Sequence, residues 1–152
     1  LETESVELVA KLQVLLANTV TVYFRAHGYH WNVKGLNFAQ YHELFETIYE
    51  DLYGSIDPTG EWVRKLDADA LCGLTDFVNN RDIQDAMIPP VNAVGMIKDL
   101  LDGIEKLDDC TEECLKLATQ EDEQGLINFL AGRLDMLEKW EWQLKSSISE
   151  VL

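Results

Sequence analysis

Apolar residues recur along this chain at the three-to-four-residue spacing of amphipathic helices. The spacing predicts four long helices, over about residues 4–31, 38–66, 91–118 and 126–149. No segment keeps the two-residue alternation of a half-buried strand for long. The pattern therefore predicts an all-α fold, in which four long amphipathic helices bury their apolar faces as a four-helix bundle.

Turn-forming and polar residues separate these helices. Residues 32–37 are rich in turn formers, and residues 121–125 form an acidic turn. The connection over residues 67–90 is long for a bundle, so we expect a short extra helix around Leu74–Asn80 within it. Pro89-Pro90 then permits the third long helix to begin.

Length and composition indicate one ordinary globular unit. We assign all 152 residues to a single domain, and an apolar content of 47% argues against disorder. No uninterrupted run of eighteen apolar residues and no basic-then-apolar leader is visible, so we expect neither a membrane span nor a signal peptide. Cys72, Cys110 and Cys114 form no CxxC pattern, which favours reduced thiols in the cytoplasm. Buried packing is the favoured role of Cys110 and Cys114, and a soft-metal site is the alternative.

The net charge of −16 repels phosphate and attracts metal cations. It therefore argues against non-specific binding of nucleic acid by this segment. The visible ends carry no Lys/Arg-rich tail, which supports the same expectation.

Five side chains that can bind a metal fall within the first two predicted helices. His42 and Glu46 are four residues apart, and so are Asp57 and Glu61, so each pair lies on one helical face. His30 stands near the end of the preceding helix. Imidazole and carboxylate together suit iron, zinc or manganese. A surface pair explains either doublet taken alone, but the combined pattern favours a metal site.

The distance between the two pairs requires a second copy of the chain. Their midpoints are fifteen residues apart, which on a continuous helix is about 22 Å at about 1.5 Å per residue. All ligands of one metal lie about 2 Å from it. Two antiparallel copies of the second helix, crossing near Asp51–Leu52, bring His42 and Glu46 of one copy to the carboxylates of the other.

The sequence of this region resembles the Dps family of mini-ferritins, DNA-binding proteins from starved cells. The resemblance rests on the segment from His30 to Phe38 (His-Trp-Asn-Val-Lys-Gly-Leu-Asn-Phe) and on His42-Glu43. Residues 137–146 resemble the last helix of that family, so the similarity covers nearly the whole chain. It implies a ferritin-like four-helix bundle with a short extra helix in the connection between the second and third long helices.

The resemblance implies a ferroxidase site shared between subunits. His30, His42 and Glu46 match the ligands from one subunit, and Asp57 and Glu61 match those from its two-fold mate.

Other positions match less directly. His27 corresponds to a histidine of some members that either ligates metal or orients a ligand. Trp31 lies next to His30, where an indole can lose an electron to an iron site, although packing is its alternative role. The acidic residues Glu121, Asp122 and Glu123 align with the family's pores for iron, and a solvated loop is the alternative.

The function implied by the resemblance is the oxidation of Fe²⁺ by hydrogen peroxide, and also by oxygen. Ferric mineral is then stored in a hollow homo-oligomer of twelve subunits built from two-fold dimers, with zinc as a possible competitor for the site. Two alternatives stay open: a DNA-compacting shell protein, and a non-catalytic shell that buffers zinc or another metal.

An iron site inside a single bundle, as in the larger ferritins, is disfavoured. Such a site uses Glu-x-x-His motifs on inward helix faces. The residues three before the histidines are Phe24, His27 and Ala39, so the chain has no such motif.

Pro58 is the main departure from a regular second helix. It removes one backbone donor and crowds the carbonyl of Gly54, and Gly60 weakens the helix further. We therefore expect a bend or a wide turn between Asp57 and Glu61 that re-aims one carboxylate and loosens the second metal position.

Overall fold

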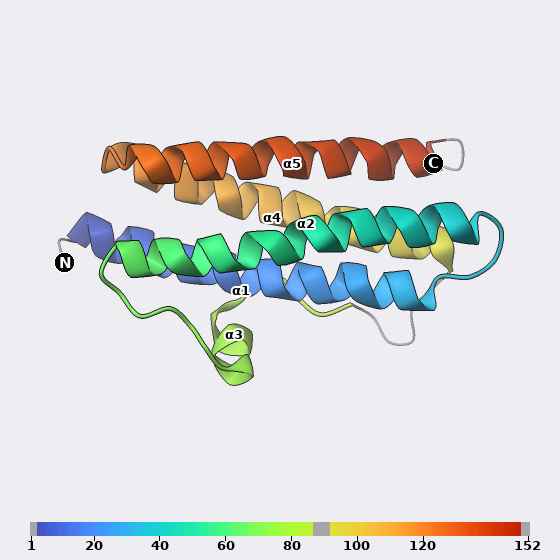
Figure 1. Ribbon diagram of the computed structural model, residues 1–152, viewed down its shortest axis with the longest axis horizontal. Coiled ribbons are helices and arrows are strands. Elements are labelled where there is room, and N and C mark those ends of the chain that lie inside the picture. Colours follow the sequence, from blue (N-terminus) through green and yellow to red (C-terminus); the bar gives the residue numbers. More distant parts are fainter. Residues whose placement is uncertain (1–2, 87–91, 150–152) are drawn as a thin grey trace.

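The computed structural model describes residues 3–86 and 92–149, and in these ranges the ordered elements are helices (Figure 1). The four long helices confirm the predicted bundle, and the short one confirms the helix expected in the long connection. Their bounds are α1 Thr3–Asn32, α2 Phe38–Lys65, α3 Leu74–Asn80, α4 Ala93–Gln120 and α5 Gln124–Ile148. The start of the third long helix after Pro89-Pro90 lies outside the described residues. Within them α4 begins at Ala93, where the Asn92 side chain accepts a hydrogen bond from the Gly95 amide at 2.9 Å.

The long helices form two antiparallel hairpins, α1–α2 and α4–α5, which a long crossover joins (Figure 1). Helix α1 lies against both α2 and α4, whereas α2 and α5 make fewer contacts. The crossover leaves α2 at the end of the bundle that holds the N-terminus and carries α3 along the side of α1.

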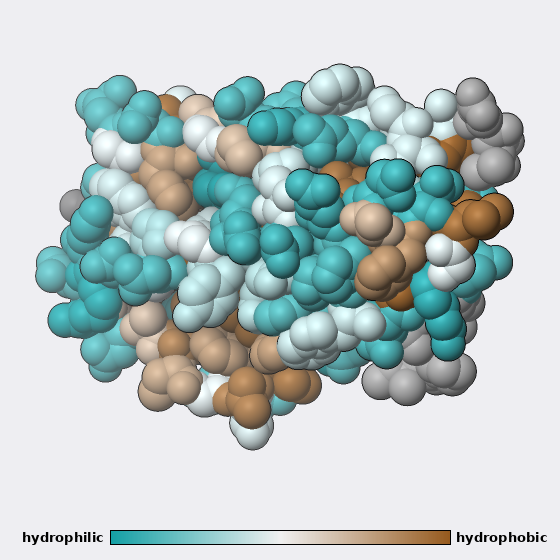
Figure 2. Space-filling model, turned by 45° about the vertical axis from the view of Figure 1, so that its right-hand side comes forward, coloured by the Kyte–Doolittle hydropathy of each residue, from teal (hydrophilic) through white to brown (hydrophobic). Residues whose placement is uncertain are grey.

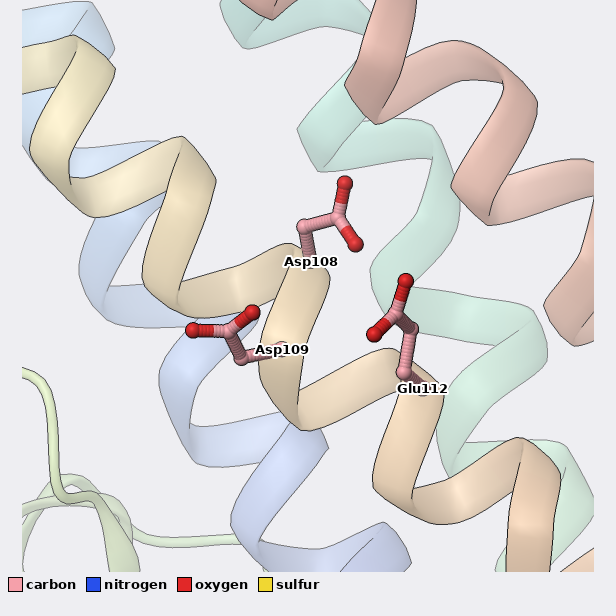
Figure 3. A group of neighbouring side chains, drawn as sticks. All are labelled: Asp108, Asp109 and Glu112. Atoms are coloured by element: carbon pink, nitrogen blue, oxygen red, sulfur yellow. The ribbon is translucent and has the colours of Figure 1, made fainter.

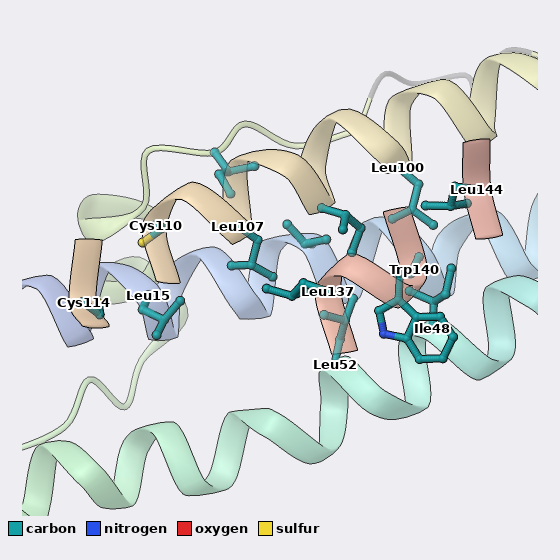
Figure 4. Packing of buried hydrophobic residues seen from close by; sticks show 14 of the residues in the cluster. Leu15, Ile48, Leu52, Leu100, Leu107, Cys110, Cys114, Leu137, Trp140 and Leu144 are labelled. Carbon is teal, nitrogen blue, oxygen red and sulfur yellow. The ribbon is translucent and has the colours of Figure 1, made fainter. Parts of the chain in front are cut away.

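The core consists of the apolar faces that the sequence pattern predicts. On α2 the buried positions follow helical spacing from Phe45 through Leu52 to Val63. Trp140 of α5 is the largest fully buried side chain, and it lies beside Ile48 and Leu52 in Figure 4. Its indole nitrogen donates a 2.8 Å hydrogen bond to Asp51, which also accepts two 2.9 Å bonds from Arg133. This polar cluster fixes the middle of α2 against α5.

Helix α1 is long and apolar enough between Val6 and Asn32 to cross a membrane, by length and composition alone. Half of its most apolar window is buried inside the bundle, and Leu8, Leu12 and Ala26 are fully buried there. A central helix of a bundle has this composition because several helices surround it.

Helix α3 leaves apolar side chains uncovered. Leu74 is 72% exposed and Val78 is 55% exposed. Figure 2 shows a brown patch at the lower edge of the molecule, where Figure 1 places α3. Large uncovered apolar patches mark contact surfaces.

Of the bend or wide turn expected at Pro58, the wide turn is wrong. Helix α2 runs without a break from Phe38 to Lys65 and contains Pro58. Two buried hydroxyls flank the proline and stay bonded within the helix: Ser55 Oγ donates to the Leu52 carbonyl and Thr59 Oγ1 to the Ser55 carbonyl, each at 2.7 Å. Asp57 and Glu61 therefore stand on one continuous helix, one turn apart.

Candidate metal centre

His30 and His42 hold each other in place through the backbone. His30 Nδ1 lies 2.8 Å from the carbonyl oxygen of His42, and His42 Nδ1 lies 2.7 Å from the carbonyl oxygen of His30. The rings are stacked, with centroids 3.7 Å apart. A carbonyl oxygen only accepts hydrogen bonds, so both Nδ1 atoms carry the proton and donate it. With Nδ1 bonded in this way, Nε2 is the ring nitrogen of each histidine that is left to bind a metal.

Glu46 completes this half of the site. Its Oε1 lies 3.8 Å from His30 Nε2, and its side chain is 46% exposed. Among the described residues, the side chains of His30, His42 and Glu46 are not close enough together for all three to bind one metal ion. The described carboxylates that are close enough lie on α4. These three side chains therefore do not by themselves form a closed metal site within one chain.

An aromatic row surrounds the histidine pair. The His27 ring is stacked on Tyr49, with centroids 3.9 Å apart, and lies 4.1 Å from Trp31. Tyr49 also meets the His30 ring edge-on, at 5.1 Å. His27 Nδ1 is hydrogen bonded to the Tyr23 hydroxyl at 2.8 Å, and burial, then the His30 ring, lower the pKa of His27. Trp31 is 67% exposed and so does not serve to fill the core of its own chain.

Asp57 and Glu61 line a separate surface cleft of about 260 Å³ farther along α2. The described residues offer neither carboxylate a hydrogen bond or an ion pair. Phe77 of α3 and Leu71 help to form the walls. The structure thus places the five predicted ligands in two groups. His30 at the end of α1 lies with His42 and Glu46 at the start of α2, whereas Asp57 and Glu61 lie toward the end of α2.

Exposed aromatic side chains lie between these two groups. Tyr53 is 63% exposed and Phe24 is 57% exposed, and both contact the Tyr23 ring, with centroids 5.4 and 5.5 Å away. This patch lies near the level at which the sequence places the two-fold crossing.

A group of carboxylates on α4 was not predicted. The side-chain oxygens of Asp108, Asp109 and Glu112 lie within 4.8 Å of one another. Figure 3 shows Asp108 and Glu112 one turn apart on α4, with Asp109 beside Asp108 and pointing away from it. Asp108 is buried, and its burial, then Glu112, raise its pKa to about 6. Glu141 of α5 shares this environment, and its burial, then Asp108, raise its pKa to about 7. The D-D-x-x-E sequence carried this signal, but acidic groups on helices are common without a metal.

The acidic turn stands between α4 and α5. Glu121 caps α4, and Glu123 precedes α5. Asp122 has a φ of 55° and accepts a 2.6 Å hydrogen bond from Gln124. These residues lie at one end of the bundle, away from His30 and His42.

A very small cavity within the bundle, about 10 Å³, is lined by Thr19, Ser55, Thr59 and Thr111 together with Arg133 and apolar residues.

Comparisons with known proteins agree with this architecture. The ferritin-like domain family matches residues 9–151. A DNA protection during starvation protein of Brevibacillus brevis is 28% identical over 131 residues, which cover 86% of this chain and 87% of that protein.

Solved structures give the same result. A Dps protein of Vibrio cholerae, described as a member of a broad superfamily of ferritin-like diiron-carboxylate proteins, superposes with a TM-score of 0.90 at 28% identity, over 96% of this chain and 91% of that one. A Dps protein of Bacillus brevis also has a TM-score of 0.90 at 28% identity, over 97% of this chain and 99% of that one. The chain therefore belongs to the ferritin-like family, and its relatives within that family are Dps proteins.

Proposed function

We propose that this protein binds Fe²⁺ at a site shared by two copies of the chain, oxidises it, and stores the ferric product inside a homo-oligomeric shell. The observation that carries the proposal is the reciprocal bonding of His30 and His42 through their Nδ1 atoms, with the Glu46 carboxylate 3.8 Å from His30 Nε2. Nitrogen and carboxylate donors of this kind suit iron.

The second half of the site comes from the partner in this proposal. Asp57 and Glu61 line a cleft of about 260 Å³ and receive no hydrogen bond or ion pair from the described part of the chain. They lie too far along α2 to reach His30 of their own chain. A two-fold axis near the middle of α2 brings each cleft to the other chain's histidines. The exposed aromatic patch of Phe24 and Tyr53 supplies apolar contact surface near that axis.

Two ferrous ions at one site can each give one electron to hydrogen peroxide. Both peroxide oxygens then become water with the uptake of two protons, and no hydroxyl radical is released. The charge of −16 on each chain favours the arrival of cations and the deposition of ferric mineral. Trp31 is exposed, and its ring centroid lies 4.1 Å from that of His27. In this proposal its indole can give up an electron when the oxidant is reduced one electron at a time.

We further propose a shell of twelve chains working in the cytoplasm, on the resemblance to Dps proteins. The relatives' names refer to protection of DNA, but the net charge of −16 disfavours direct binding of DNA by this segment. Protection through removal of Fe²⁺ and peroxide requires no DNA contact.

The test is complementation between two inactive variants. His30→Ala and Glu61→Ala should each lose most fast Fe²⁺ oxidation, followed by absorbance with peroxide and with oxygen, while size-exclusion chromatography shows the shell intact. When the two are coexpressed, a mixed dimer has one intact site and one doubly defective site, so random mixing restores about one quarter of the sites.

Activity near that fraction supports a shared site. A coexpressed sample that oxidises Fe²⁺ no faster than the separate variants would contradict a shared site. The same holds if oxidation recovers in samples that contain no mixed dimers. Glu43→Gln is the matched control, because Glu43 is exposed beside His42 and should leave oxidation unchanged. If the original protein holds zinc at full occupancy and does not oxidise Fe²⁺, the result would instead favour the metal-buffering alternative.

A further inference from the structure

Two buried thiols one turn apart on α4 have opposite hydrogen-bonding roles. Cys110 is 5% exposed and Cys114 is fully buried, and both are free thiols. Asn18 Nδ2 lies 3.6 Å from Cys110 Sγ and donates to it, whereas Cys114 Sγ donates to the carbonyl oxygen of Lys11 at 3.5 Å. The bonding therefore favours a negative charge on Cys110 and a proton on Cys114.

Cys110 is one of the residues that line a surface cleft. The cleft, of about 250 Å³, lies between α1, α4 and the segment around Ile83, and Cys114 is not part of this lining. Lys11 and Lys106 contribute cationic groups to the cleft, beside carboxylates from the same walls. A small polar molecule can thus reach Cys110 without unfolding the bundle.

The charges around the pair separate the two thiols further. The contact with Cys114 has the largest effect and lowers the pKa of Cys110. The Asn18 hydrogen bond and the Lys11 ammonium lower it further, whereas burial and the Asp82 carboxylate raise it. The same contact and burial raise the pKa of Cys114. Because the thiolate is the nucleophile, Cys110 is the reactive member.

We propose that Cys110 is a modification site at which hydrogen peroxide oxidises the thiolate to a sulfenic acid. The sulfur attacks one peroxide oxygen and forms an S–O bond while the O–O bond breaks. The departing hydroxide takes up a proton and leaves as water. The sulfur loses the two electrons that the peroxide gains.

Cys114 does not serve as the resolving thiol, because α4 holds it too far away. Residues four apart on a helix have Cβ atoms about 5–6 Å apart, whereas a relaxed disulfide needs about 3.5–4.5 Å. An external low-molecular-weight thiol must therefore condense with the sulfenic acid, which releases water and forms a mixed disulfide with Cys110. A second external thiol then attacks the outer sulfur of that disulfide and releases the Cys110 thiolate.

The test uses the full-length, assembled protein carrying Cys72→Ser, since Cys72 is an exposed thiol that would compete. Iron is removed with a chelator, so the result does not depend on the proposed ferroxidase. The protein is treated with hydrogen peroxide in the presence of dimedone, which traps sulfenic acids, and the adducts are mapped by mass spectrometry. We expect the adduct on Cys110, none on Cys114, and none in Cys110→Ser.

Matched variants separate this role from a structural one. Lys11→Gln should slow adduct formation several-fold with an unchanged circular dichroism spectrum and shell size, because it removes a cation beside the sulfur. Cys114→Ser should keep the adduct on Cys110. The proposal is overturned if Cys110 gives no dimedone adduct under conditions in which the protein that keeps Cys72 is labelled at Cys72. It is also overturned if Cys114 is labelled as much as Cys110, or if a Cys110–Cys114 disulfide forms instead.

Discussion

At the scale of single residues, backbone contacts decide which nitrogen of His30 and His42 is left for the proposed metal. His30 stands in the last turn of α1, where the backbone carbonyls lack partners within the helix. Its carbonyl accepts the Nδ1 proton of His42, so a helix end and a ligand satisfy each other. The sequence predicted both residues as ligands, but not this exchange, because it depends on how α1 and α2 meet across the turn at residues 33–37.

The carboxyl pair Asp108 and Glu141 gives the first prediction. Both groups have a pKa above their ordinary values, to about 6 and about 7, chiefly through burial. The folded protein therefore binds more protons here than the unfolded chain, and stability falls as the pH rises from about 4 to about 7. Glu141→Gln removes one charge and keeps a polar amide, so it should raise stability at pH 8 and change it little at pH 4.

The gain should stay below about 1 kcal/mol, because Glu141 is partly exposed and solvent screens its charge. Thermal unfolding of both proteins across this pH range measures it. Glu43→Gln, far from the pair, should give no such pH-dependent difference. A stabilisation by Glu141→Gln that is equal at both pH values would show that charge repulsion is not its cause.

At the scale of elements, apolar spacing was sufficient to predict the helices. Each long helix lies within a few residues of its predicted bounds, because one face must remain apolar along its whole length to reach the core. The short α3 was predicted from the length of its connection and coincides with the expected residues. The cluster of Asp51, Arg133 and Trp140 was not predictable, since it joins residues 82 and 89 positions apart.

Pro58 shows where local rules fail. A proline in a helix interior costs about 3 kcal/mol in isolation, and the expected turn followed from that cost. Tertiary packing outweighs it here: Ser55, Thr59 and Val63 are buried on the same face of α2, and an open turn would expose them. The helix continues because its buried face extends on both sides of the proline.

Pro58→Ala is therefore expected to stabilise α2 without rebuilding the site. The new amide can donate to the Gly54 carbonyl, so thermal stability should rise by a few degrees and hydrogen exchange should slow around residues 54–62. Fe²⁺ oxidation should stay within about twofold, since Asp57 and Glu61 already stand on a continuous helix. Pro58→Gly should gain little, because glycine costs about 1 kcal/mol relative to alanine. A change in the number of bound metals in Pro58→Ala would show that the proline shapes the site after all.

At the scale of the whole molecule, the negative charge of the chain bears on how Fe²⁺ reaches the proposed site. Every chain carries −16, and twelve chains in a shell would enclose a strongly negative interior. Such a field attracts Fe²⁺ from every direction, but in the proposed function the ion crosses the wall at particular places. The turn from Glu121 to Glu123 lies at the end of the α4–α5 hairpin and is the candidate for that passage.

Asp122 allows this proposal to be tested without disturbing the turn. Its φ of 55° lies in the left-handed region, which asparagine also tolerates, and the asparagine side-chain oxygen can still accept the bond from Gln124. Asp122→Asn should slow Fe²⁺ uptake a few-fold at low ionic strength, and the difference should shrink at about 0.5 M salt because exposed charges are then screened.

Asp67 supplies the matched control, because it too is an exposed acidic residue in a turn, with a φ of 66°, after the end of α2. Asp67→Asn removes the same charge from each chain in the same backbone conformation, so any effect of net charge alone appears equally in both variants. Stopped-flow measurement of Fe²⁺ oxidation compares the two. A larger loss in Asp122→Asn indicates that iron passes the α4–α5 turn. Equal losses would mean that only the total charge matters and that the passage lies elsewhere.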